Sequence, residues 1–177
     1  SKEMISNAWT DNTYTQIVGD VLTLADIDDC TFDIIICHNV LEYVDNKAMI
    51  IKELSRVLKE DGFISIAKHN RAGRVMQMAV LLDDFERANK LLDGENGTAS
   101  KFGAIRYYED DDIINWEPEL RIKECFGIRT FWDLQQNQAK HSEEEWQEKM
   151  IQLEMRVSQI EEFRKIAFFH HLILGKV

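Results

Sequence analysis

Short apolar runs alternate with amphipathic stretches along the chain, and this alternation predicts strands and helices in turn. Residues 32–37 (FDIIIC) form an almost uninterrupted apolar run, which is typical of a strand buried on both faces of a parallel sheet. A helix capped by Asp45 or Asn46 should come next, with Gly62 ending it in a left-handed conformation. Residues 63–67 (FISIA) then predict a second strand, so the whole segment is a βαβ unit.

The rest of the pattern predicts further elements on both sides of this unit. Before it come a helix at 1–8 and a strand at 14–18. After it we expect a helix at 74–92 closed by Gly94, a polar loop at 94–103 and a short helix at 110–116. A strand at 120–132 should follow, with a bulge or bend at Gly127. The chain should then form a helix from 142 to 164, opened by a capping box at Ser142, and a strand at 166–174. The apolar stripe of the 142–164 helix is most simply core packing. This order predicts an α/β domain with a parallel core and an antiparallel C-terminal edge.

Charge and composition narrow the class of protein. The 177 residues carry 32 acidic and 21 basic side chains, for a net charge of −11. This balance argues against a general polyanion binder, although a local basic patch stays open. A hydrophobic content of 45% with the single proline Pro118 excludes a disordered chain.

The metal-binding and redox residues give no sign of a metal site. Cys30, Cys37 and Cys125 have neither metal-like nor disulfide-like spacing, and such sparse cysteines favour a reducing, cytoplasmic location. His170 and His171 are adjacent on a predicted strand, so they should point to opposite faces and not share a metal. No apolar run approaches the roughly 20 residues that a membrane span needs. We therefore expect a soluble protein without a metal or a membrane partner.

Two blocks carry a resemblance to a known family. Residues 32–44 (FDIIICHNVLEYV) and 54–62 (LSRVLKEDG) resemble the class I S-adenosylmethionine-dependent methyltransferases of type 11. The resemblance implies a Rossmann-like sheet, S-adenosyl-L-methionine as cofactor and a methyltransferase activity. Residues 38–44, 70–73 (NRAG) and 127–131 (GIRTF), with the helix at 142–164, are similar to the tRNA 5-carboxymethoxyuridine methyltransferase branch.

One departure from the family concerns its N-terminal motifs. The glycine-rich loop after the family's first strand and the acidic residue after its second strand are absent, and residues 1–4 match the family's sequence immediately after that acidic residue. We therefore expect residues 1–177 to be one methyltransferase domain, N-terminally incomplete, with inserted helices at about 74–93 and 142–164. Its sheet should lack the first two strands, leaving an open edge beside the 32–37 strand. The missing part would belong to a longer polypeptide, or a swapped or partner segment would fill the gap.

The resemblance also implies roles for cofactor-binding residues. Asp20 would meet the adenine amino group, and Val21 would contribute its backbone amide to the adenine ring. His38 would border the methionine portion of the cofactor, and Asn39 shares that location. Asp20 and His38 each have a plainer alternative, namely a turn or helix-capping residue for Asp20 and a loop residue bonded to the backbone for His38.

On the acceptor side, Tyr43 would line the methyl-transfer pocket, and Arg71 with Arg129 would meet an anionic substrate. Asn70 and Arg74 open onto the same face. These roles lead to a methyltransferase that acts on the carboxylate of 5-carboxymethoxyuridine in tRNA. The alternatives are a small-molecule methyltransferase, which the net charge favours somewhat, and a non-catalytic fragment that acts as a binding scaffold. The oligomeric state stays open.

Overall fold

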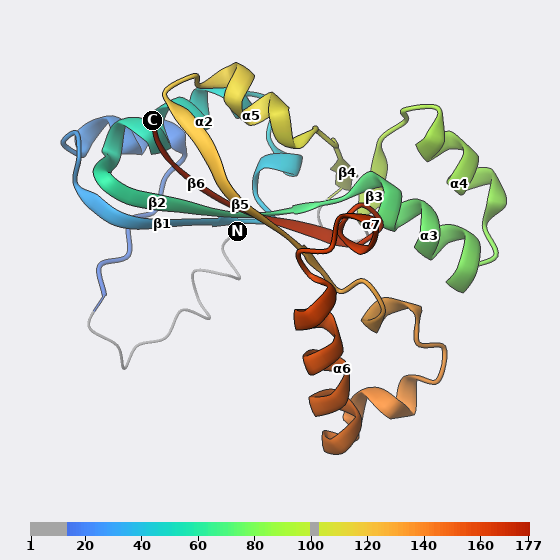
Figure 1. Ribbon diagram of the computed structural model, residues 1–177. Coiled ribbons are helices and arrows are strands. Elements are labelled where there is room, and N and C mark those ends of the chain that lie inside the picture. Colours follow the sequence, from blue (N-terminus) through green and yellow to red (C-terminus); the bar gives the residue numbers. More distant parts are fainter. Residues whose placement is uncertain (1–13, 100–102) are drawn as a thin grey trace.

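The computed structural model describes residues 14–99 and 103–177, so the helix expected at 1–8 lies outside the described residues. Its main sheet has four strands in the order β1-β2-β6-β5 (Figure 1), formed by β1 (Phe32–His38), β2 (Leu58–His69), β6 (Phe169–Lys176) and β5 (Leu120–Ile128). β1 and β2 are parallel, whereas β6 runs antiparallel to both of its neighbours. The parallel core and the antiparallel C-terminal strand are confirmed, with β6 inserted between β2 and β5.

The crossover helix of the βαβ unit forms where the sequence predicts it. α2 spans Lys47–Val57, and the Asn46 side chain caps it by accepting from the Met49 amide at 3.2 Å. The prediction for Gly62 was wrong, because α2 ends at Val57 and Gly62 lies within β2 without a positive φ. A Cβ at Gly62 would lie 2.7 Å from the Asp33 carbonyl oxygen, so this glycine permits the close approach of two strands.

One face of the sheet carries the main hydrophobic core. α2 and α5 (Asp110–Trp116) cover this face, together with the short 3-10 helices η1 (Val21–Asp26) and η2 (Leu41–Tyr43) (Figure 1). The core consists of side chains from the sheet and from these covering elements: Cys37, Leu41, Ile51, Leu54, Leu58, Ile64, Ile66, Tyr108, Ile113, Leu120, Leu172 and Leu174. The core therefore fixes the loops that leave the carboxyl ends of β1 and β2.

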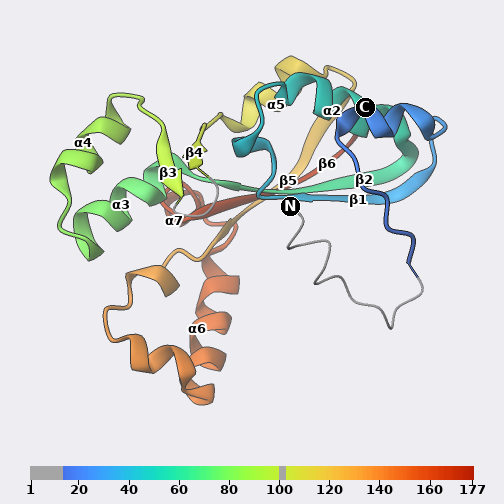
Figure 2. The ribbon, with the colours of Figure 1, turned by 180° about the vertical axis from the view of Figure 1, so that it is seen from behind.

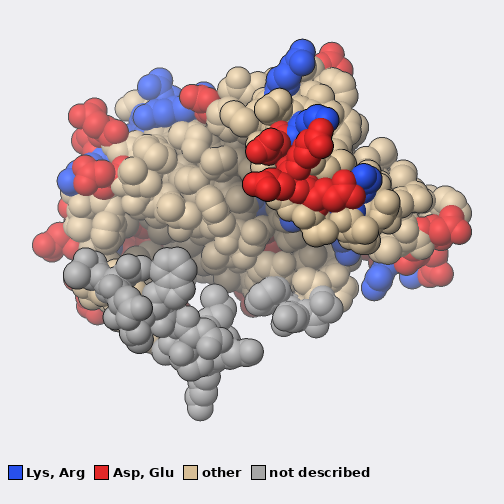
Figure 3. Space-filling view, turned by 90° about the horizontal axis from the view of Figure 1, so that it is seen from below, with Lys and Arg blue, Asp and Glu red and all other residues tan. Residues whose placement is uncertain are grey.

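The opposite face of β1 is open in the described part of the chain. Ile34 and Ile36 are 54% and 69% exposed, and Figure 3, which views the molecule from below, shows a broad uncharged surface there. Among the described residues β1 pairs only with β2, which agrees with the expected open edge. The strand predicted at 14–18 was wrong, because this exposed segment has no ladder partner in the described residues.

The region after β2 holds two helices and a hairpin where one helix and a loop were predicted. α3 (Arg71–Leu81) and α4 (Phe85–Leu92) are separated by a turn in which Asp83 has a φ of 51°. The Asp84 side chain starts α4 by accepting from the Arg87 amide at 3.0 Å. β3 (Gly97–Ala99) and β4 (Gly103–Ile105) form an antiparallel pair beside these helices (Figure 2). Gly94 follows α4 with a φ of 92°, which fits its predicted role.

The helix expected from 142 to 164 is divided into α6 (Glu144–Val157) and α7 (Glu161–Arg164), preceded by η3 (Trp132–Leu134) and η4 (Gln138–Ser142). The predicted capping box is absent, since the Ser142 hydroxyl donates to the Ala139 carbonyl instead. The core role of the α6 stripe was also wrong, because Val157 is the only buried residue within this helix. No helix within residues 14–99 and 103–177 combines the length and apolarity needed to cross a bilayer.

The bend expected at Gly127 in β5 lies elsewhere. The register of β5 against β6 shifts between Ile122 and Glu124, whereas Gly127 pairs regularly with His170. A Cβ at Gly127 would lie 2.8 Å from both the Ala167 Cβ and the Arg164 Cα. This glycine therefore allows the chain before β6 to pack closely on β5.

Candidate functional site

The candidate site lies at the carboxyl ends of β1 and β2, where open α/β sheets bind ligands. A hollow of about 820 Å³ opens there, bordered by η1, the end of β1, η2 and α2. Its lining includes three of the predicted site residues, Asp20, Val21 and Tyr43. A second hollow, of about 720 Å³, lies at the amino end of β1 beside Cys30 and Lys176, away from all the predicted site residues.

Asp20 and Val21 lie at the start of η1. The Asp20 Oδ1 accepts from the Leu22 amide at 2.9 Å, so the plainer capping role is present. This bond leaves Asp20 Oδ2 available to an amine in the hollow. Val21 is the first residue of η1, and the helix itself does not use an amide at that position. The pair can therefore offer one acceptor and one donor side by side, which matches the edge of an adenine ring.

His38 ends β1 and belongs to a polar chain that crosses three strands. The Ser65 hydroxyl lies 2.8 Å from His38 Nε2 and 2.7 Å from His171 Nε2. Asn39 comes next with a φ of 52°, and its amide donates to the Ala67 carbonyl at 2.8 Å. Neither His38 nor Asn39 lines the 820 Å³ hollow, although both adjoin its residues Cys37 and Val40.

Tyr43 is held at the mouth of the site by the end of β2. Its hydroxyl lies 3.3 Å from His69 Nε2. The neighbouring Glu42 is fully buried and accepts from the His69 amide at 2.6 Å, which ties η2 to β2. Burial raises the pKa of the Glu42 carboxyl above its ordinary value, against the effect of the His69 hydrogen bond. The sequence reasoning missed His69, although this residue follows an apolar strand as directly as Asn70 does.

The acceptor-side cluster consists of Tyr43, His69, Arg74, Arg129 and the Phe168–Phe169 pair. The His69 ring centroid lies 5.7 Å from that of Phe168 and 4.7 Å from that of Phe169. The Arg129 guanidinium lies 5.5 Å from both phenylalanine rings, and that of Arg74 lies 5.8 Å from Phe168. Burial lowers the pKa of His69 to about 4, and the charges of Arg74 and Arg129 add to the effect. His69 is therefore neutral at pH 7 in a positive electrostatic environment.

Arg71 is engaged elsewhere. Its guanidinium donates to the Leu91 and Glu95 carbonyls at 3.1 and 2.8 Å and lies over the Tyr107 ring. Asn70 caps α3 and donates to the Lys165 and Ala167 carbonyls. Both residues brace the loops around α3, and Arg74 is the α3 arginine near His69.

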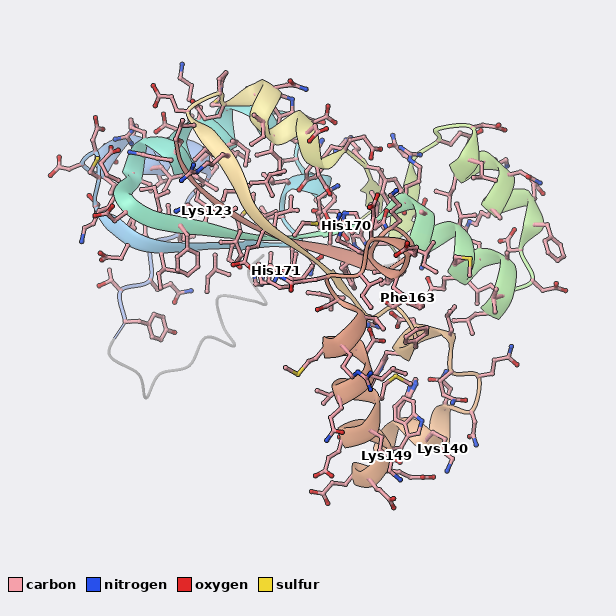
Figure 4. The ribbon with its side chains drawn as sticks, in the orientation of Figure 1. Lys123, Lys140, Lys149, Phe163, His170 and His171 are labelled. Carbon is pink, nitrogen blue, oxygen red and sulfur yellow. The ribbon has the colours of Figure 1, made fainter. Side chains whose placement is uncertain are left out.

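His170 and His171 point to opposite faces of the sheet, as predicted (Figure 4). His170 Nδ1 lies 2.8 Å from Asp110, and its Nε2 lies 3.0 Å from the Arg164 carbonyl oxygen. Cys125 also adjoins Asp110, which completes a group of three metal-ligating residue types that sequence spacing did not reveal. However, Asp110 is already paired with the buried Lys68 at 2.7 Å, and both ring nitrogens of His170 face oxygen acceptors. The cluster is an ion-pair network in this structure.

Comparison with known proteins supports the predicted class. The family described as "Methyltransferase domain" matches residues 1–66. A curated relative, a ubiquinone biosynthesis O-methyltransferase from Glaesserella parasuis serovar 5, is 30% identical over 109 residues, covering 57% of this chain. The alignment covers 43% of the relative, so the chain spans less than half of its length.

Solved structures share the fold over nearly the whole chain. A SAM-dependent methyltransferase from Archaeoglobus fulgidus matches with a TM-score of 0.53 at 13% identity, covering 100% of this chain and 73% of that one. An S-adenosylmethionine-dependent methyltransferase from Mesorhizobium loti matches with a TM-score of 0.52 at 12% identity, covering 98% and 76%. The chain has the Rossmann-like fold of these methyltransferases. The match of residues 1–66 to the methyltransferase-domain family points to the same class of protein.

Proposed function

We propose that the chain forms the cofactor and acceptor sides of an S-adenosylmethionine-dependent methyltransferase whose acceptor is a carboxylate oxygen. The observation that carries this proposal is the acceptor-side cluster, in which Arg74 and Arg129 flank a neutral His69 next to Tyr43. This cluster adjoins the 820 Å³ hollow through Tyr43.

The hollow fits a cofactor of this kind. Its volume lies within the roughly 300–1,000 Å³ of small-molecule sites. Asp20 and Val21 would hold the adenine, and His38 with Asn39 would border the methionine end. The cofactor supplies an electrophilic methyl group on a positive sulfur. The residues of this chain would orient the acceptor and exclude water from it, which is a large part of the catalysis that such a displacement needs.

The electrostatics favour an acceptor that is already ionised. With a pKa of about 4, His69 is a poor proton acceptor at neutral pH, because an effective general base has a pKa near the working pH. A carboxylate needs no base, since its ordinary pKa is near 4. Arg74, which has no ion pair with a carboxylate among the described residues, would hold such an anion and keep it ionised. Arg129 is ion-paired with Asp133, so it would have to share its guanidinium between Asp133 and the acceptor.

The carboxylate of 5-carboxymethoxyuridine in tRNA satisfies these requirements and agrees with the resemblance over residues 38–44, 70–73 and 127–131. A hydroxyl oxygen on a small molecule is the second candidate. It is favoured by the curated relative, which is named for ubiquinone biosynthesis, and by the net charge of −11. Both candidates are oxygen methylations, and they differ in whether a proton must leave the acceptor.

Transfer of a labelled methyl group separates these candidates. We expect label in bulk tRNA, with loss of transfer in Arg129→Gln, and release of the label by mild base as an ester would allow. Label that enters small hydroxyl compounds but not tRNA would support the small-molecule candidate. Failure of the chain to bind S-adenosylhomocysteine in calorimetry, with no transfer to any acceptor, would overturn the methyltransferase proposal and favour a binding scaffold.

A further inference from the structure

A small pocket beside the acceptor-side cluster is enclosed by α3, α4 and the segment that leads into β3. Its volume is about 170 Å³, below the roughly 300 Å³ at which drug-sized ligands begin to fit. The lining residues are Arg74, Met78, Arg87, Lys90, Leu91, Glu95, Asn96, Gly97 and Thr98. Arg71 supports this wall, because its guanidinium holds the Leu91 and Glu95 carbonyls.

The pocket is positive on a strongly acidic protein. Arg74, Arg87 and Lys90 line it, and Glu95 is the acidic residue of the lining. Lys90 is ion-paired with Glu86 at 2.6 Å, so the two arginines supply most of the unpaired positive charge. Within the described residues neither arginine has a carboxylate within ion-pair distance, and Arg74 is hydrogen-bonded to the neutral Gln77. Burial lowers the pKa of Arg74, and the nearby positive charge of Arg87 lowers it further. The side chains of Arg74 and Arg87 therefore line the same pocket, and neither has an ion pair with a carboxylate among the described residues, although the charge of Asp133 also acts on Arg74.

Neutral hydrogen-bond donors complete the pocket. Thr98, Asn96 and the Gly97 backbone lie along one wall. A Cβ at Gly97 would lie 2.8 Å from the Tyr107 hydroxyl, which is buried and has no partner among the described side chains and backbone. The wall therefore brings a buried hydroxyl without a protein acceptor close to the cationic groups.

We propose that this pocket binds a phosphate group. Its size suits a phosphate and excludes a nucleoside, and its lining holds two arginines, the residue type whose planar guanidinium binds two phosphate oxygens at once. Arg74 belongs to both the pocket and the acceptor-side cluster, so the phosphate would be carried by the methyl acceptor. In this respect the proposal rests on the proposed function. The source is either a nucleic-acid backbone or a small phosphate ester.

The test compares two double variants of the full chain. Arg87→Gln with Lys90→Gln removes two positive charges from the pocket, and both residues are exposed on α4, so the fold should be kept. Lys123→Gln with Lys149→Gln removes two exposed positive charges elsewhere on the molecule (Figure 4). Each protein is titrated with inorganic phosphate and with a single-stranded RNA octamer, and amide shifts of residues 94–98 report on the pocket.

We expect phosphate to shift the amides of residues 94–98 in the unmodified and control proteins, and to bind the pocket variant at least tenfold more weakly. If RNA is the source, the pocket variant should also lower the slope of log affinity against log salt by about 0.7 for each backbone phosphate that it no longer neutralises. Binding of phosphate without RNA would assign the pocket to a small phosphate ester.

Two results would overturn the proposal: no shift of residues 94–98 at saturating phosphate, or equal phosphate affinity in the pocket and control variants. Binding of S-adenosylhomocysteine by the unmodified chain, measured on the same sample, separates this failure from failure of the proposed function. A protein that binds S-adenosylhomocysteine but no phosphate would overturn only the pocket proposal.

Discussion

Glu154 should determine whether α6 stays attached to the end of β5. Its carboxylate accepts three backbone hydrogen bonds, from the amides of Thr130, Phe131 and Trp132, at 2.7 to 2.9 Å. These amides come directly after Arg129 and have no strand partner once β5 ends at Ile128. The carboxylate therefore replaces the hydrogen bonds that the sheet no longer supplies, and it fixes the chain next to Arg129.

Replacement of Glu154 by Ala should cost about 3 kcal/mol of unfolding free energy. Hydrogen bonds to a charged group contribute about 1.5–3 kcal/mol each, but Glu154 is only partly buried and the released amides can bind water, so we take about 1 kcal/mol for each bond. Glu154→Gln should lose about half as much. Its amide oxygen can still accept from Phe131 and Trp132, while its NH2 group faces the Thr130 amide.

Urea unfolding monitored by tryptophan fluorescence measures this loss, since the rings of Trp132 and Trp146 lie 4.9 Å apart between η3 and α6. Hydrogen exchange should show the amides of residues 130–132 losing protection, and methyl transfer should slow because Arg129 is no longer fixed. Glu148→Ala, an exposed position on the same helix, is the control and should stay within about 0.5 kcal/mol of the unmodified protein. Equal stability of Glu154→Ala and this control, with protection of residues 130–132 retained, would refute the reasoning.

Three further predictions concern the other clusters. Burial raises the pKa of the Asp110 carboxyl, but the contacts with His170 and Lys68 outweigh burial and hold this pKa well below its usual range. The ionised Asp110 therefore stabilises the folded protein above about pH 4, and this stabilisation is lost as the pH falls. Asp110→Asn should therefore cost about 3 kcal/mol in urea unfolding at neutral pH, and the cost should shrink as the pH falls below about 4; a cost that is the same at pH 7 and pH 3 would contradict this. Tyr43→Phe should reduce kcat less than about tenfold and leave its pH profile unchanged. A loss of about 100-fold or more, which is typical of removing a general base, would contradict the proposal that the acceptor is already ionised. Gly73→Ala should lower the free energy of unfolding by about 2 kcal/mol, since the new Cβ would meet the Ala167 carbonyl oxygen. Gly94→Ala should lower it by about 1 kcal/mol, because alanine disfavours the φ of 92° at that position. Urea unfolding that ranks the two variants in the opposite order would contradict the packing account.

The sequence could predict the elements whose form depends on local pattern and burial. β1 and β2 are apolar runs, and α2 carries its own cap at Asn46, so periodicity and capping were enough. Gly62 shows the limit of such reasoning. Its position after a helical stripe favoured a helix stop, but its close approach to the Asp33 carbonyl depends on the pairing of β1 with β2, which no local pattern contains.

The same limit explains the elements that were missed. The apolar stripe runs through Leu82 and Phe85 at helical spacing, yet both are more than half exposed, because the chain turns at Asp83 and starts a new helix with Asp84 as its cap. α6 likewise has a stripe, but it packs on η4 and the Trp132 region and leaves the stripe residue Leu153 exposed. A hydrophobic period predicts a helix more securely than it predicts the surface against which the helix packs.

Some residues of the candidate site could be predicted from the sequence, and others depend on contacts between distant segments. Asp20, Val21 and Tyr43 line the hollow, although the strand expected before Asp20 does not form in the described residues and the 3-10 helices η1 and η2 were not predicted. His171 could not be predicted, because it reaches Ser65 across 106 positions and depends on β6 lying beside β2. Glu42 was missed for the opposite reason. A glutamate in a loop is usually exposed, and only the closure of η2 onto β2 buries it.

Arg71 and Arg74 show why residue type and position at a helix start cannot settle a role. They are three residues apart on α3, and both come after the carboxyl end of β2, but the sequence analysis assigned the anionic substrate to Arg71. The turn at Asp83 brings α4 back along α3, and the Leu91 and Glu95 carbonyls then take up the Arg71 guanidinium. Arg74, one turn further along, meets Arg87 and the aromatic cluster instead, where no carboxylate of the described chain pairs with it. The anion binding that we propose for Arg74 therefore depends on how α4 packs, and it should be lost in a variant that straightens the α3–α4 turn even if every cationic side chain is kept.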